Sequence, residues 1–161
     1  MSMSSPTQKS NDKIKTYLTA NFDLNRFIVA QSIMYSTALE EIKAGRKQSH
    51  WMWYIFPQIH GLGYSATTMK FAIQSKAEAL SYLNHPILGN RLIEITTAFY
   101  NIENKTAKEV LGSPDHLKLK SSMTLFHSIQ NEHRIFGDVL TKYFEGKTCL
   151  HTIQTLNSEN G

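Results

Sequence analysis

The chain has little cysteine and no long apolar run. Its 161 residues include one cysteine, Cys149, which excludes an internal disulfide and a metal site built from several thiolates. No stretch approaches the roughly 18 apolar residues that span a bilayer, and residues 1–12 lack the apolar segment of a secretory signal. We therefore expect a cytoplasmic protein with no membrane segment.

The sequence patterns of several enzyme classes are also missing. The seven histidines show no metal-binding spacing such as His-Glu-x-x-His, and the chain has no complete phosphate loop and no nucleophile elbow. Asp115 and His116 do not form a catalytic dyad, because adjacent residues on a helix point apart. We expect no metal and infer no cofactor, and whether the chain is an enzyme stays open.

The charge of the chain excludes little. Seventeen Lys and Arg against thirteen Asp and Glu give a net charge of +4, which favours anionic partners in general. The cations are scattered, and their only local cluster, Lys43, Arg46 and Lys47, lies where the end of a helix favours positive charge. Nucleic-acid binding is not indicated, and the oligomeric state is not predicted.

The length of the chain fits one domain. Residues 1–20 are rich in Ser, Lys, Asn and Thr and are predicted to form a disordered N-terminal arm. Residues 21–157 are predicted to form a single helical domain, followed by a short tail at 158–161.

Helix signals run through this domain. Apolar residues between Phe27 and Ile42 recur at spacings of three and four and predict a helix over 24–43, stopped by Gly45. Further signals are two capping boxes at 75–78 and 106–109, a first-turn proline at 114, a break at His85-Pro86, and a helix end at Gly146. We predict an all-α, compact single-domain bundle of about six to eight helices with an irregular aromatic connector.

This connector, residues 50–58, concentrates both tryptophans with His50 and Gln58. Pro57 prevents a continuous helix through it, and its composition is too apolar for an exposed loop. Two interpretations stay open: the aromatic rings are core anchors, or at least one of them faces a ligand. The Gly-Leu-Gly turn at 61–63 leads into a helix for which Ser65 is the expected N-cap.

A second segment, residues 114–126, carries many hydroxyls for an apolar helix. Lys118 together with Ser121, Ser122 and Thr124 provides a hydroxyl and ammonium patch suited to phosphate or carboxylate. The alternative is that the hydroxyls bond to the preceding turn of their own helix and Lys118 lies in solvent.

These strings resemble a known family. Ser-His-Trp-Met-Trp at 49–53, Phe-Pro-Gln-Ile at 56–59, Gly-Leu-Gly at 61–63 and Lys-Leu-Lys-Ser-Ser-Met-Thr-Leu-Phe at 118–126 are similar to the family known as domain of unknown function 1810. The resemblance covers residues 22 to about 156 and implies an all-helical single domain whose activity is not established. The chain departs from the family at His116 and near Cys149, where acidic residues are usual.

Our leading hypothesis is a pocket for a small anionic molecule, of nucleotide or sugar-phosphate type, between the 50–58 connector and the 118–124 helix. The residues expected to bind the ligand are Arg26, Lys47, Trp51, Trp53, Gln58, Lys118, Ser121, Ser122 and Thr124. If the protein is an enzyme, His50 is the expected acid or base, because the pKa of histidine lies near neutrality. The alternative is a non-enzymatic module that binds protein or nucleic acid.

Overall fold

The computed structural model describes residues 22–129 and 132–159. Within them lie nine helices and no strand, which confirms the predicted all-α class. The predicted arm at 1–20 lies outside the described residues. The helices are α2 (Asn25–Lys43), α3 (Met52–Ile55), α4 (Ala66–Phe71), α5 (Lys76–Asn84), α6 (Leu88–Tyr100), α7 (Ala107–Leu111), α8 (Asp115–Ser128), α9 (Ile135–Phe144) and α10 (Leu150–Ser158). Short elements such as α3 and α7 bring the number above the expected six to eight.

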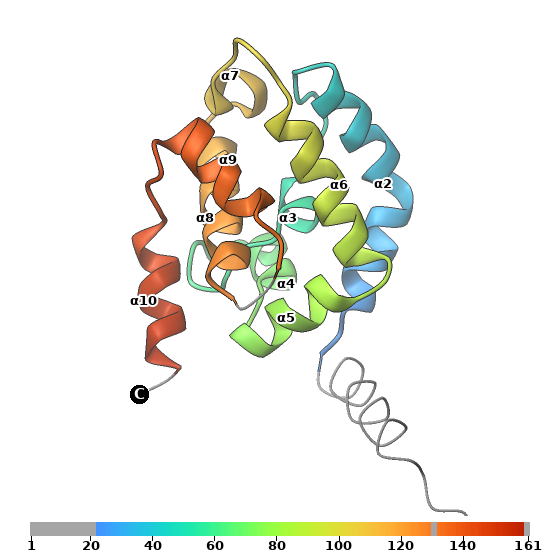
Figure 1. Ribbon diagram of the computed structural model, residues 1–161. Helices are drawn as coiled ribbons and strands as arrows, with labels where there is room; N and C mark the ends of the chain where they lie inside the picture. Colours follow the sequence, from blue (N-terminus) through green and yellow to red (C-terminus); the bar gives the residue numbers. More distant parts are fainter. Residues whose placement is uncertain (1–21, 130–131, 160–161) are drawn as a thin grey trace, which may run out of the picture.

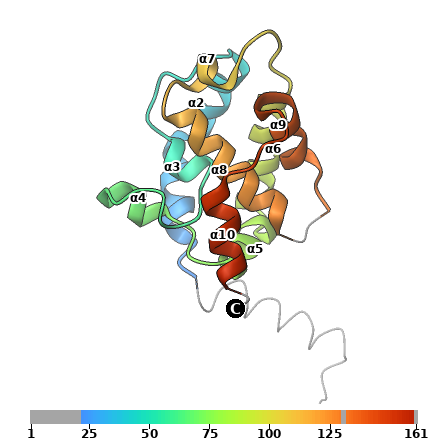
Figure 2. The ribbon, with the colours of Figure 1, turned by 90° about the vertical axis from the view of Figure 1, so that its left-hand side faces the viewer.

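Helix α8 lies at the centre of the arrangement. It contacts α5, α7, α9 and α10, while α2 packs along α6 on the other side (Figure 1). Helix α4 stands out at the edge of the molecule (Figure 2). In the described part of the chain, no helix combines the length and apolar character needed to cross a membrane.

Local sequence signals set most helix ends. α2 ends at Lys43 and is followed by Gly45 with a φ of +78°, a conformation that glycine adopts without steric cost. Thr106 and Glu109 form the complete reciprocal capping box before α7. At α5 only half of the box is present: Ser75 caps Glu78, but the Glu78 carboxylate accepts from another amide, that of Gln74.

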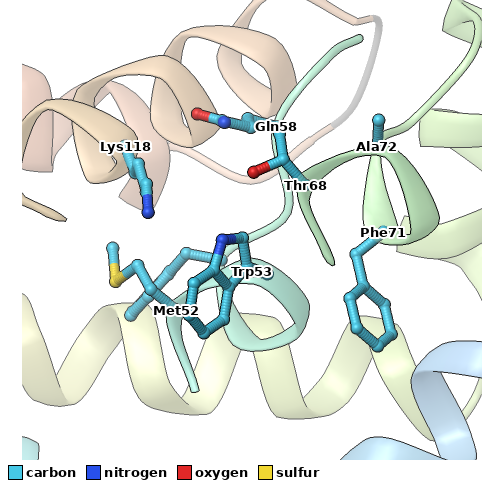
Figure 3. A pocket seen from close by; sticks show the side chains of 8 residues that line it. Met52, Trp53, Gln58, Thr68, Phe71, Ala72 and Lys118 are labelled. Atoms are coloured by element: carbon cyan, nitrogen blue, oxygen red, sulfur yellow. The ribbon is translucent and has the colours of Figure 1, made fainter. Parts of the chain in front are cut away.

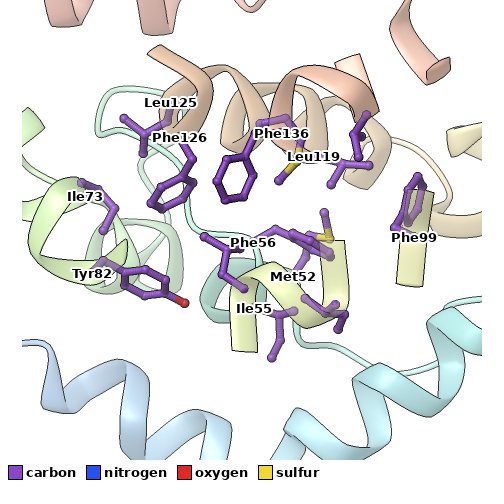
Figure 4. Packing of buried hydrophobic residues seen from close by; sticks show 14 of the residues in the cluster. Met52, Ile55, Phe56, Ile73, Tyr82, Phe99, Leu119, Leu125, Phe126 and Phe136 are labelled. Atoms are coloured by element: carbon purple, nitrogen blue, oxygen red, sulfur yellow. The ribbon is translucent and has the colours of Figure 1, made fainter. Parts of the chain in front are cut away.

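The apolar core joins the connector to the central helices. One face of α6 is buried, formed by Leu88, Leu92, Ile95 and Phe99. Phe56 and Met52 from the connector meet Phe126 and Phe136 from α8 and α9 (Figure 4). The connector therefore lies in the middle of the protein, with its first part wound into the single turn of α3.

One backbone contact closes the segment that carries α4. Ile59 and Ile73 form an isolated parallel bridge. The Ile73 amide donates to the Gln58 carbonyl at 2.9 Å, and the His60 amide donates to the Ile73 carbonyl at 2.9 Å. The chain between 60 and 72 thus departs from this bridge and returns to it, and Phe71 within it packs against Phe27 and Tyr54.

Candidate functional site

A small cavity lies where the connector meets α8, and α4 covers its other side. Its volume is about 10 Å³, close to the room that one water molecule needs. The lining residues are Met52, Trp53, Phe56, Gln58, Thr68, Phe71, Ala72 and Lys118. We call this the junction cavity. Of the nine residues predicted to bind a ligand, it brings three together: Trp53, Gln58 and Lys118.

Two polar side chains of the junction cavity, Gln58 and Trp53, have no hydrogen-bond partner among the described residues. Gln58 is 8% exposed, and its side-chain amide makes no hydrogen bond to any described residue. The indole N–H of Trp53 likewise has no acceptor in the described part of the chain. Figure 3 shows the Lys118 ammonium, the Thr68 hydroxyl and the Trp53 nitrogen turned toward the same hollow. Thr68, contributed by α4, was not predicted.

Three charged side chains, Lys47, Asp115 and Lys118, form a cluster next to this cavity. Asp115 lies between two lysines, with its carboxylate 3.0 Å from Lys47 Nζ and 3.3 Å from Lys118 Nζ. Each lysine also faces an indole: Lys47 Nζ is 5.2 Å from the Trp51 ring centroid and Lys118 Nζ is 4.8 Å from that of Trp53. Two ammonium groups share one carboxylate, so the cluster keeps one excess positive charge.

Glu41, near the end of α2, holds the start of the connector. Its carboxylate accepts from the Gln48 amide at 2.8 Å, from the Ser49 amide at 3.0 Å and hydroxyl at 2.6 Å, and from the Trp51 indole at 2.9 Å. Burial raises the pKa of Glu41, but these hydrogen bonds outweigh it and lower the pKa to about 2. Sequence reasoning missed this residue. A carboxylate in the last turn of a helix, where negative charge is unfavourable, was the available signal.

Trp51 and His50 do not line the junction cavity. Trp51 is fully buried, and its indole N–H is taken by Glu41, so its ring belongs to the core in this conformation. His50 is exposed before α3, and its carbonyl accepts from the Tyr54 hydroxyl at 3.3 Å. The structure thus separates the two tryptophans between core and cavity.

Arg26 lies at a different place on the molecule. Its guanidinium donates to Glu78 at 3.1 Å, to the Lys70 and Ala72 carbonyls at 2.8 and 3.0 Å, and to the Asp23 carbonyl. These bonds tie the start of α2 to the end of α4, to the residue that follows it and to the first turn of α5. Arg26 does not line the junction cavity.

The three hydroxyls of α8 also lie outside the junction cavity. Ser121 donates to the Leu117 carbonyl at 3.1 Å and Thr124 to the Lys120 carbonyl at 2.8 Å, as the alternative interpretation of this segment predicts. Thr124 also accepts from the Cys149 amide at 2.9 Å. Ser122 is fully buried, and its hydroxyl has no partner among the described residues.

Fold and site together define an all-helical domain with a small, mostly apolar cavity between an aromatic connector and its central helix. The chain belongs to the family described as Protein of unknown function (DUF1810), whose model matches residues 21–156. This confirms the family resemblance of the sequence motifs.

A solved structure supports the same fold. The chain is similar to the conserved hypothetical protein Rv1873 from Mycobacterium tuberculosis, whose crystal structure was determined at 1.38 Å. The two are 43% identical, with a TM-score of 0.83, over 84% of this chain and 97% of that one. No curated protein matches the chain in sequence.

Proposed function

We propose that the protein binds a small anionic molecule of nucleotide or sugar-phosphate type at the junction cavity. The observation that carries the proposal is the Gln58 side chain, which lines the cavity, is 8% exposed and makes no hydrogen bond to the described residues. Its amide can therefore donate to and accept from a ligand without breaking a hydrogen bond within the described structure.

The other groups of the cavity favour an anion with a flat part. Lys118 supplies an ammonium donor, the Trp53 indole N–H supplies a second donor, and the pair of lysines around Asp115 leaves positive charge in excess. The half-exposed Trp53 ring offers a face on which a planar group stacks once Lys118 turns away. His50 lies outside the cavity lining, so no catalytic step is assigned to it.

Binding requires the cavity to open, because its present volume accommodates about one water molecule. The cavity opens when the Lys118 side chain rotates away from Asp115. This rotation has little electrostatic cost, because the Asp115 carboxylate keeps Lys47 as its partner at 3.0 Å. An incoming phosphate or carboxylate replaces Asp115 as the counter-ion of Lys118.

The test is a thermal-shift screen of the protein against nucleotides, dinucleotides and sugar phosphates at millimolar concentration. A ligand that binds the folded state raises the melting temperature. We expect Lys118→Met to abolish the shift and Lys120→Met, on the same helix but outside the cavity, to preserve it.

The variant Gln58→Met distinguishes a loss of ligand binding from a loss of folding. The amide makes no hydrogen bond to the described residues, so the variant should keep a stability within about 1 kcal/mol of the wild type while losing the ligand-induced shift. If no compound of the panel stabilises the protein, the alternative of a protein or nucleic-acid interaction module is favoured.

A further inference from the structure

A larger groove lies on another part of the surface, between the end of α8, the outer side of α9 and the loop that follows α9. Its volume is about 330 Å³, within the usual range for small-molecule sites. The residues that matter for its chemistry are His127, Arg134, Gly137, Asp138, Thr141 and Thr148. We call it the α8–α9 groove. It shares no lining residue with the junction cavity.

A glycine in the interior of α9 makes room for His127 in this groove. A Cβ atom at Gly137 would lie 2.8 Å from Cε1 and 2.9 Å from Nδ1 of the His127 ring, closer than such atoms approach. Glycine in a helix interior lowers the stability of the helix relative to alanine. At this position, the missing side chain leaves space for the His127 imidazole beside the groove.

The charged groups of the groove form no ion pair with the part of the chain that the structure describes. Arg134, the N-cap of α9, and Asp138 in its first turn are four residues apart, a spacing at which ion pairs form, yet neither takes part in any ion pair among residues 22–129 and 132–159. The ring nitrogens of His127 also make no hydrogen bond within these residues. A cation, an anion and an imidazole, all exposed, thus line one groove without a hydrogen-bonding or ion-pair partner among the described residues.

We propose that the α8–α9 groove binds a free α-amino acid. The guanidinium of Arg134, assisted by His127, binds the carboxylate, and the carboxylate of Asp138 binds the ammonium group. Planar guanidinium matches carboxylate with two parallel hydrogen bonds. Arg134 and Asp138 together are neutral, which suits a dipolar ligand better than the multiply charged phosphates considered for the junction cavity.

The experiment starts with NMR titration of the isotope-labelled protein with each standard amino acid at millimolar concentration. We expect at least one of them to shift the amide signals of residues 134–141. For that amino acid, calorimetry then compares the free form with its primary amide and its N-acetyl derivative. Each derivative lacks one of the two charges and should bind about tenfold more weakly or worse.

Two variants assign the charges. Arg134→Gln should bind the free amino acid and its amide equally, and Asp138→Asn should bind the free and N-acetylated forms equally. Lys43→Gln and Glu40→Gln, which remove the same charges from exposed positions of α2, should leave all affinities unchanged.

The proposal is overturned if no amino acid shifts the signals of α9. It is also overturned if Arg134→Gln and Asp138→Asn, shown to be folded by circular dichroism, retain the preference of the wild type. Neither result bears on the junction cavity, because no lining residue is shared.

Discussion

The Glu41 carboxylate accepts the indole N–H of Trp51 at 2.9 Å, which links the last turn of α2 to the aromatic connector. The same carboxylate binds two backbone amides of the segment between them. This one side chain therefore fixes where the connector enters the core.

Replacing Glu41 by Gln should destabilise the protein at neutral pH by about 1–2 kcal/mol, because charge-assisted hydrogen bonds are lost from a partly buried group. The pKa of Glu41 is about 2 in the folded protein against an ordinary value of 4.5. A depressed pKa gives stability that is complete above about pH 4.5 and is lost as the pH falls toward 2. Urea denaturation at several pH values should show the wild type approaching Glu41→Gln in this window. A constant difference down to pH 2 would contradict the assignment.

The Arg26–Glu78 ion pair should be the costly one to break. Its side chains are only 12% and 3% exposed, and removing one partner of a buried pair typically costs about 3–5 kcal/mol. We expect Arg26→Met to approach that loss in urea denaturation and the double variant Arg26→Met/Glu78→Gln to recover part of it. As a comparison, Lys147→Met breaks an exposed ion pair, in which the side chains of Lys147 and Glu145 are 71% and 82% exposed. This variant should change the stability by less than about 0.5 kcal/mol.

Two buried threonines should respond to valine with opposite signs. Thr96 on α6 is fully buried, and its hydroxyl has no partner among the described residues, so Thr96→Val should stabilise the protein by about 1 kcal/mol. Thr124 is equally buried but donates to the Lys120 carbonyl and accepts from Cys149. Thr124→Val should therefore destabilise by about 1–2 kcal/mol. Equal effects in calorimetry would show that the Thr96 hydroxyl has a partner after all.

Replacing two helical glycines by alanine should change the stability of the protein by different amounts. A Cβ at Gly89 would lie 1.9 Å from the Leu83 carbonyl oxygen, so backbone must move and Gly89→Ala should cost about 3 kcal/mol. At Gly137 the obstacle is the exposed His127 ring, which can rotate away. Gly137→Ala gains about 1 kcal/mol of helix propensity and should melt near or above the wild type. A strong loss at Gly137 would mean that His127 is held rigidly.

Helix positions were predictable because their signals are local. The apolar spacing of α2 and the Thr106–Glu109 box act over a few residues, and each is found in the structure. The half-formed box at Ser75 shows the limit. Glu78 pairs with Arg26, 52 residues away, and no local pattern specifies such a partner.

The candidate site was predictable only in its location. Trp53, Gln58 and Lys118 meet as expected, whereas Arg26 and the α8 hydroxyls do not reach the same cavity. Which side of α8 faces the connector depends on how that helix packs against its neighbours, and its mixed sequence gives no clear apolar face. Thr68 could not be anticipated, because the bridge between Ile59 and Ile73 that returns α4 to the cavity is a tertiary contact.

That bridge has a consequence for how this family can diversify. Because the chain departs and returns at one point, the outermost part of the excursion, around α4, contributes Thr68 to the cavity while its residues from Tyr64 to Thr67 stay exposed. Evolution can vary the exposed residues 64–67 without repacking the helices beneath them, whereas Phe71 at the end of α4 packs against Phe27 and Tyr54 in the core. Relatives with the same scaffold can therefore differ in what they admit to the cavity.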